Sequence, residues 1–313
     1  MNMFLDPNAK ENTIRNEVSC SGIGLHSGKT IHLRLLPAPE ESGVIFIRRD
    51  LGGILIPADH SHIVSTYLST TIGVEGASVQ TIEHLMAAVY AMGIHNLIVE
   101  LDGPEVPVMD GSSEPFIALL SKAGVLCQDK PRTFMEIMKE VTVSDNERRV
   151  TIHPSSSFEI EYKIAYSHPV ISKQSYHYRH SPLAFKKEIA SARTFGFLKD
   201  VQSLQEQGLA RGGSLENAVV IGDDGVLNKQ GLRFSDEFVR HKILDLIGDL
   251  SLIGMPILGR VEATCSGHSL HAELIEEVLE NKNAWRIVTA PSLVKERPVY
   301  PAYQGMSLPL PTI

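Results

Sequence analysis

Residues 80–92 read QTIEHLMAAVYAM and are followed by Gly93. Apolar side chains recur here at the three- and four-residue spacing of a helix, namely at Ile82, Leu85, Met86, Val89 and Tyr90. The other side of the helical wheel carries small alanines, so the helix is apolar all round and we expect it to be buried. We predict that it is capped by Ser78 and ended by Gly93.

Glu83 and His84 are the only acidic or basic residues between Ile82 and Met92. Both would lie in a region of low dielectric, where a charge without a partner costs several kcal/mol. The pair therefore needs a partner from elsewhere in the chain. For His84 taken alone, a ring satisfied by a backbone carbonyl is an equally good interpretation.

A second helix is predicted over about 237–253, with its polar residues gathered on one side of the wheel. His241 and Asp245 are four residues apart, so one helical face can offer both to a single metal ion. Alone, this pattern is more typical of a solvent-facing helix surface. Together with His84, however, these residues would supply three ligands and leave a fourth position open, as in a catalytic zinc site. Glu83 points about 100° away from His84 and is placed to act as a base toward water.

The two predicted helices occupy matching places in a repeated unit. His241 follows His84 by 157 residues, and Ser269 follows Ser113 by 156. In each half the helix precedes a strand and a further helix. We therefore predict an α+β fold built from two repeated α/β domains.

We expect the first domain to cover residues 1–127 and the second 128–285. A segment over about 197–227 fits neither copy and is predicted to be an insertion. Residues 286–313 are rich in proline and are predicted to form an extended tail. The glycine-punctuated stretch 21–29 favours a tight hairpin turn over a ligand-binding loop.

A third polar group surrounds the predicted start of a helix after Gly267. His268 is a candidate general acid or oxyanion partner, and Asp249 is a candidate to orient it and to favour its charged form. A histidine that only caps the helix is the alternative interpretation. His271 is expected at the surface.

The net charge of −8 excludes the basic surface typical of a nucleic-acid-binding protein, so a substrate with phosphates would need a local cluster of cations. No apolar run approaches the roughly 18 residues of a membrane span, and the N-terminus does not read as a signal peptide. Cys20, Cys127 and Cys265 form no Cys-x-x-Cys pair, which favours a reducing compartment. We expect a cytoplasmic protein.

Several motifs together resemble the UDP-3-O-acyl-N-acetylglucosamine deacetylase family, the zinc enzymes that commit a cell to lipid A synthesis. They follow the family order over roughly residues 14–280. They are TIEHL at 81–85, HKILDLIGDL at 241–250, Gly267-His268, GLHSG at 24–28, PEVPVMDGS at 104–112 and ARTFG at 192–196. The resemblance implies two α/β domains whose helices are sandwiched between two outer β-sheets.

The resemblance also implies a role for each polar residue. The zinc ligands would be His84, His241 and Asp245. Glu83 would be the general base and His268 the cationic acid, with Asp249 as its partner. Thr194 would polarise the carbonyl of the substrate.

For substrate binding, the resemblance places Lys242 near the phosphates and assigns contacts to Phe195 and Leu68. The insertion over 197–227 corresponds to a passage for an acyl chain. Its expected apolar lining is Phe195, Phe197, Leu198, Leu204 and Leu209.

The chain departs from the family pattern in two stretches. Where many members carry an acidic residue and Phe before x-His-Pro, this chain has Ala165 and Tyr166. Tyr166 is able to stack on uracil, but the acidic hydrogen-bond partner is missing. Ser69 replaces a cysteine that some members carry.

The expected partner is a UDP-linked acylated amino sugar, with no nucleic acid and no transmembrane segment, and we expect a monomer. The ligand set accepts Zn²⁺ and also Fe²⁺. Two other functions remain as alternatives, an iron(II) oxygenase with a facial triad of two histidines and one carboxylate, and an inactive sugar-nucleotide or lipid-binding protein. A base and an acid beside the metal favour the hydrolase.

Overall fold

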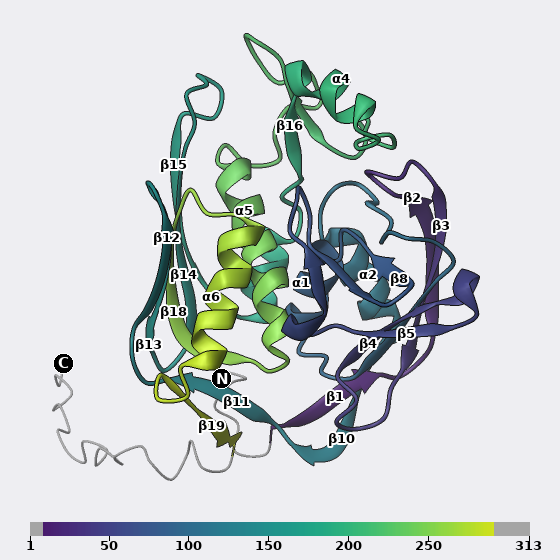
Figure 1. Ribbon diagram of the computed structural model, residues 1–313, viewed down its shortest axis with the longest axis vertical. Coiled ribbons are helices and arrows are strands. Elements are labelled where there is room, and N and C mark those ends of the chain that lie inside the picture. The colour runs from purple at the N-terminus through teal and green to yellow at the C-terminus, as the bar shows by residue number, and fades with distance from the viewer. Residues whose placement is uncertain (1–8, 291–313) are drawn as a thin grey trace, which may run out of the picture.

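The computed structural model describes residues 9–290 (Figure 1). Two β-sheets form the outer layers and the main helices lie between them, which confirms the predicted α+β sandwich. Within the described part of the chain, none of the helices has both the length and the apolar character that crossing a membrane requires.

The first half of the chain forms a five-stranded sheet in the order β2-β3-β9-β4-β5. Its strands are β2 (Val18–Ile23), β3 (Thr30–Pro37), β9 (Leu97–Leu101), β4 (Val44–Arg48) and β5 (Ile54–Pro57). Neighbours are antiparallel except β9 and β4, which run parallel. Along β3 buried and exposed side chains alternate, because one face of the sheet packs on the helices and the other faces solvent.

The second half repeats this topology in the order β12-β13-β18-β14-β15. Its strands are β12 (Val141–Asp145), β13 (Arg148–Pro154), β18 (Ile257–Thr264), β14 (Phe158–Ala165) and β15 (Lys173–Arg179). Again the third and fourth strands in this order are parallel and the other neighbours antiparallel. The repeat expected from the sequence offset is therefore present in the strand order.

Two further strands, β11 (Thr133–Ile137) and β19 (Trp285–Thr289), extend the second sheet. Residues 286–289 of the predicted tail thus belong to β19, and residues 291–313 lie outside the described residues. The predicted domain boundary after residue 127 falls within β10 (Val125–Pro131), which pairs with β1 (Lys10–Ile14). The domain limits themselves remain a prediction.

Four helices fill the middle layer (Figure 1). They are α1 (Glu83–Ala91), α2 (Glu114–Ala123), α5 (Glu237–Leu250) and α6 (His268–Glu280). Helix α1 packs against α5, the equivalent helix of the other half, and α2 and α6 pack against α1 and α5, respectively. One large hydrophobic core runs through both halves.

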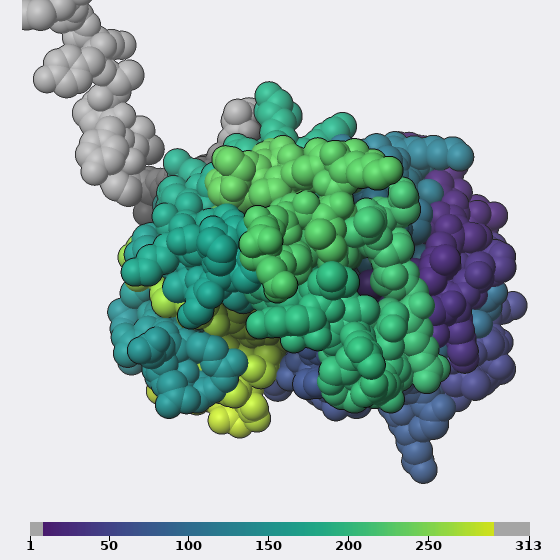
Figure 2. Space-filling model, turned by 90° about the horizontal axis from the view of Figure 1, so that it is seen from above, coloured from purple at the N-terminus to yellow at the C-terminus, as the bar shows by residue number. Residues whose placement is uncertain are grey.

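The remaining elements are smaller. They are the sheet β6 (Ile63–Ser65), β7 (Thr71–Val74) and β8 (Ala77–Val79), and the short helices η2 (Arg49–Leu51), η3 (His60–His62), α3 (Pro182–Ala184), η4 (Phe185–Ile189) and η5 (Ser251–Ile253). The insertion contains β16 (Phe195–Phe197), α4 (Leu198–Glu206) and β17 (Val219–Ile221). This green insertion lies at the upper end of the molecule in Figure 1 and therefore faces the viewer in Figure 2, which is seen from above.

Helix α1 begins three residues later than the predicted residue 80, and Ser78 does not cap it. Ser78 belongs to strand β8, Thr81 has a positive φ of 57°, and no side chain caps the first turn. The chain therefore enters α1 through a sharp turn. This turn places Glu83 and His84 in the first turn of the helix, at its buried end.

Gly248 lies in the last turn of α5, directly against the first turn of α1. A Cβ atom at this position would collide with the backbone of Glu83, including its carbonyl carbon and oxygen. Glycine usually weakens a helix, so its presence here has a packing reason. The absent side chain lets the two helix backbones approach closely enough for their polar residues to meet.

We expect Gly248→Ala to lower the free energy of unfolding by about 1–3 kcal/mol, because backbone atoms of α1 must shift. Helix propensity alone would predict the opposite sign, since alanine is favoured over glycine by about 1 kcal/mol. Urea denaturation measures the difference. Gly225→Ala is the control, because its Cβ would enter open space. Equal stability of the two variants would contradict the close approach.

Candidate functional site

The crossing of α1 and α5 brings His84, His241 and Asp245 together. The Nε2 atoms of His84 and His241 lie 3.7 and 3.3 Å from Asp245 Oδ1, and one ligand atom from each residue falls within 4.8 Å of the others. All three side chains are buried. The predicted convergence of residues from both halves of the chain is thus present in the structure.

The protonation of this cluster suits a metal ion. His241 Nδ1 donates a hydrogen bond to the Ala192 carbonyl at 3.0 Å, which leaves the lone pair of Nε2 directed at the cluster. Burial lowers the pKa of His84 to about 3, so its ring is neutral. Burial alone would raise the pKa of Asp245, but His241 and Lys242 hold it well below its usual value. The donor set is therefore two neutral imidazoles and one carboxylate.

Glu83 lies beside this cluster and is 3% exposed. Its Oε2 accepts a hydrogen bond from the Thr70 backbone N–H at 3.2 Å, and its Oε1 lies 3.9 Å from His268 Nε2. Burial raises the pKa of Glu83 to about 8, and the nearby His268 opposes this rise. Such a carboxyl group can accept and release a proton near neutral pH.

His268, at the start of α6, has a strong anionic partner. Its Nδ1 lies 2.7 Å from Asp249 Oδ2. Burial by itself would lower the pKa of His268, but the charge and hydrogen bond of Asp249 raise it to about 9. His268 is therefore expected to be an imidazolium ion at neutral pH.

Asp249 is held from three sides. Besides His268, it accepts a hydrogen bond from Thr70 Oγ1 at 2.6 Å and another from His271 Nδ1, also at 2.6 Å. Burial alone would raise the pKa of Asp249, but the charge and hydrogen bond of His268 and the hydrogen bond of His271 keep it below its usual value. The orientation of the carboxylate, and with it that of His268, is fixed by the surrounding hydrogen bonds.

The prediction that His271 lies at the surface is wrong, because its side chain is completely buried. Its Nε2 lies 2.9 Å from Ser266 Oγ, which is in turn 2.8 Å from the Tyr162 hydroxyl. A signal for this burial exists in the sequence. Leu274, Ile275 and Val278 follow His271 at the three-, four- and seven-residue spacing of one helix face, and all three are core residues.

A cavity of about 370 Å³ opens above these groups. Ten of the eleven predicted site residues line it, and Asp249 lies behind His268. The ten are Leu68, Glu83, His84, Tyr166, Thr194, Phe195, His241, Lys242, Asp245 and His268. Lys242 Nζ is 2.6 Å from Asp245 Oδ2, so its positive charge sits at the edge of the ligand cluster.

The cavity is also lined by residues that were not predicted to belong to the site, among them Leu25, His26 and Arg148. Leu25 and His26 belong to the turn between β2 and β3. The carboxylate of Glu105 holds this turn by accepting the backbone N–H groups of His26 at 2.9 Å and Ser27 at 2.8 Å. The stretch is therefore a hairpin turn, as favoured from the sequence, and it also forms part of the cavity wall.

Apolar side chains gather beside the cavity. The Tyr166 ring lies 6.1 Å from the rings of both Phe195 and Phe197. Leu68 and Leu198 are exposed, and the hydroxyl of Tyr67 reaches Gln207 after helix α4 at 3.5 Å. Of the five residues expected to line an acyl passage, Phe195 lines this cavity.

This arrangement defines a class of protein. A metal-dependent hydrolase needs metal ligands, a proton acceptor and a proton donor in one cavity. This cavity contains a buried cluster of two histidines and one aspartate, with a carboxyl group and an imidazolium beside it.

Comparison with known proteins identifies the family within this class. The family model described as LpxC, UDP-3-O-acyl N-acetylglycosamine deacetylase, matches residues 11–280. A protein of that name from Citrifermentans bemidjiense is 50% identical over 279 residues, covering 89% of this chain and 92% of the relative. Those from Myxococcus xanthus and Wolinella succinogenes are 48% and 46% identical, covering 90% of this chain and 90% and 94% of the relatives. The chain belongs to the UDP-3-O-acyl-N-acetylglucosamine deacetylase family, as the motifs indicated, and is a hydrolase that acts on an amide bond.

We expect His271→Leu to reduce the free energy of unfolding by about 1–3 kcal/mol, because Asp249 loses a buried donor and Ser266 loses one of its two side-chain partners. His271→Asn keeps an N–H group near Asp249 and should lose less. Urea denaturation measures both. The exposed His177 provides the matched control, since His177→Leu should change stability by less than about 0.5 kcal/mol. A loss no larger than that of the control would contradict a structural role for His271.

Proposed function

We propose that this protein removes the acetyl group from UDP-3-O-((R)-3-hydroxyacyl)-N-acetylglucosamine, the committed step of lipid A synthesis. One observation carries the proposal. Glu83 and His268 lie 3.9 Å apart in the cavity that also holds the His84, His241 and Asp245 cluster. The names of the relatives, all UDP-3-O-acyl-N-acetylglucosamine deacetylases, support the choice of substrate.

We propose Zn²⁺ as the metal ion, held by His84, His241 and Asp245. Two neutral imidazoles and a carboxylate with a fourth position open suit zinc, and Fe²⁺ accepts the same donors. When bound, the ion polarises the acetyl carbonyl and makes water more acidic. Lys242 neutralises the second oxygen of Asp245, so that the cluster stays compact inside the protein.

The remaining groups move protons and position the substrate. Glu83 accepts a proton from the attacking water, because its raised pKa makes it a stronger base than an exposed carboxylate. His268 is charged and donates a proton to the leaving amine. Thr194 lines the same cavity, and its hydroxyl is the proposed donor to the oxygen of the acetyl carbonyl.

The cavity walls match the chemistry of the substrate. Lys242 and Arg148 provide the local cations that a net charge of −8 requires for binding phosphates. Tyr166 offers a ring face for uracil. Leu68 and Phe195 form an apolar entrance, and the apolar side chains of the insertion continue it as a passage for the acyl chain.

We place the protein in the cytoplasm as a monomer. Its three cysteines are free thiols, which suits a reducing compartment. Deacetylation without oxygen would distinguish the proposed reaction from that of an iron(II) oxygenase. Acetate release from the acylated UDP-sugar by the purified, metal-loaded protein under anaerobic conditions is the direct test, and no release would refute the proposal.

Glu83→Gln should leave the metal content unchanged and lower kcat/KM by roughly 10²–10⁴, because the amide cannot accept the proton. Metal analysis and acetate release on the same sample measure both quantities. Glu273→Gln, on the exposed side of α6, is the control and should behave as wild type. Near-normal turnover by Glu83→Gln would rule out its role as base.

Asp249→Asn should shift the alkaline limb of the pH profile of kcat/KM toward lower pH by at least about one unit. In the native protein His268 is protonated below its pKa of about 9, and activity is lost as pH rises through that value. Without the negative charge of Asp249 this pKa falls, so the loss begins earlier. An alkaline limb that stays in place would show that His268 is not the acid.

A further inference from the structure

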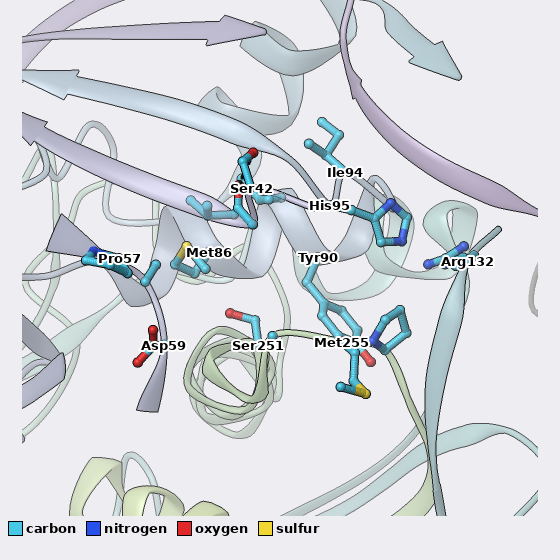
Figure 3. A pocket seen from close by; sticks show the side chains of 17 residues that line it. Ser42, Pro57, Asp59, Met86, Tyr90, Ile94, His95, Arg132, Ser251 and Met255 are labelled. Carbon is cyan, nitrogen blue, oxygen red and sulfur yellow. Dashed lines mark hydrogen bonds between the residues drawn. The ribbon is translucent and has the colours of Figure 1, made fainter. Parts of the chain in front are cut away.

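A second cavity of about 130 Å³ lies between the C-terminal part of α1, the start of β4 and the segment after η5 (Figure 3). It shares no lining residue with the cavity of the metal cluster. Its apolar walls come from both halves of the chain and include Val44, Pro57, Met86, Val89, Ile94 and Met255. An occupant would therefore contact both repeated units.

Three hydrogen-bonding groups, from His95, Arg132 and Tyr90, also line this cavity. His95 and Arg132 lie close together on one side, whereas Asp59 lies on the opposite side (Figure 3). The basic side chain of Arg132 and the carboxyl group of Asp59 thus lie at opposite ends of the cavity.

His95 presents a proton donor. Its Nδ1 lies 3.0 Å from the backbone N–H of Asn12 and must accept that hydrogen bond, so the ring proton resides on Nε2. This Nε2 is buried and has no hydrogen-bond partner among residues 9–290. Burial and the nearby Arg132 lower the pKa of His95 to about 3, so the ring keeps this neutral form at physiological pH.

Arg132 and Tyr90 add to the same polar end. The Arg132 side chain is almost completely buried, and although burial lowers its pKa to about 10, it remains a cation at neutral pH. The Tyr90 hydroxyl accepts the backbone N–H of Ile257 at 3.1 Å. Burial raises the pKa of Tyr90 to about 12, so the hydroxyl keeps a proton that it can donate. The three groups together offer positive charge and N–H and O–H donors.

We propose that this cavity binds a small aliphatic monocarboxylate, with its carboxylate toward Arg132 and His95 and its carbon chain against Met86, Val89 and Ile94. The volume resembles that of cavities of about 150 Å³ that hold benzene, which limits the ligand to about four to six carbons. Asp59 at the far end opposes a second negative charge, so a dicarboxylate fits poorly. This site is independent of the proposed deacetylation.

Methionine methyl groups allow a direct test on the full-length, metal-loaded protein. Met86 and Met255 both line the cavity, so their ¹³C-methyl resonances should shift and saturate on titration with butyrate or hexanoate. For a ligand of this size we expect a dissociation constant of about 1 mM. Butyramide has the same shape without the charge and should bind at least about ten-fold more weakly.

Two substitutions of His95 provide a matched pair. In His95→Asn the amide oxygen can still accept the Asn12 N–H, but the Nε2 donor is lost, and butyrate affinity should fall about ten-fold. In His95→Gln the side-chain N–H₂ reaches toward the former Nε2 position, and affinity should fall less. Arg132→Met should abolish binding, and the His95 pair keeps the test valid if that variant does not fold.

Carboxylates also bind metal ions, and the variants separate this effect from the proposed site. Binding at the metal would persist unchanged in His95→Asn, because His95 does not line the metal-site cavity. The proposal would therefore be overturned if the methyl shifts in His95→Asn had the same size, and butyrate the same dissociation constant, as in the wild-type protein. Equal binding of butyrate and butyramide would also overturn it, as would the absence of a saturable shift at Met86 and Met255 with any of the acids.

Discussion

The close approach of α1 and α5 is the constraint on which the rest of the molecule depends. Each helix belongs to one copy of the repeated unit, and α5 packs against strands β14 and β15 of its own sheet. Because Gly248 has no side chain, the first turn of α1 can lie against the C-terminal part of α5. Glu83 and His84 then face His241 and Asp245 across the contact between α1 and α5. A site assembled in this way needs both halves, so neither copy could provide it alone.

Burial at the contact between α1 and α5 determines the protonation of the polar groups there. A carboxyl group with few partners, Glu83, keeps a raised pKa, whereas Asp249 accepts hydrogen bonds from three side chains and stays ionised. The same low dielectric strengthens the pairing of Asp249 with His268, which outweighs the burial penalty on the imidazolium. Two carboxyl groups on neighbouring helices therefore differ in protonation, because Glu83 can take up a proton near neutral pH whereas Asp249 is a fixed anion.

Much of this arrangement could be predicted from the sequence, because charged residues on an apolar helix require partners and the repeat indicated where those partners lie. The start of α1 could not be predicted, since the positive φ of Thr81 goes with tertiary hydrogen bonds, from the Thr81 hydroxyl to Glu105 and from the Ile82 N–H to the Thr70 carbonyl. Leu25 and Arg148 reach the cavity only through tertiary packing, which leaves no local pattern. His271 was missed for a different reason, because a polar residue was assumed to face solvent although its spacing to the core residues indicated burial.

The geometry of two crossing helices also explains why the molecule has a second cavity. Packed helices cross at an angle, so their axes separate away from the point of closest approach. At the first turn of α1 the contact is tight enough to require glycine on α5. Toward its C-terminal end, α1 presents Met86, Val89 and Tyr90, and the segment after α5 turns away through Gly254. The space that opens there is lined by side chains of both halves, so the packing that assembles the metal cluster at one end leaves a cavity at the other.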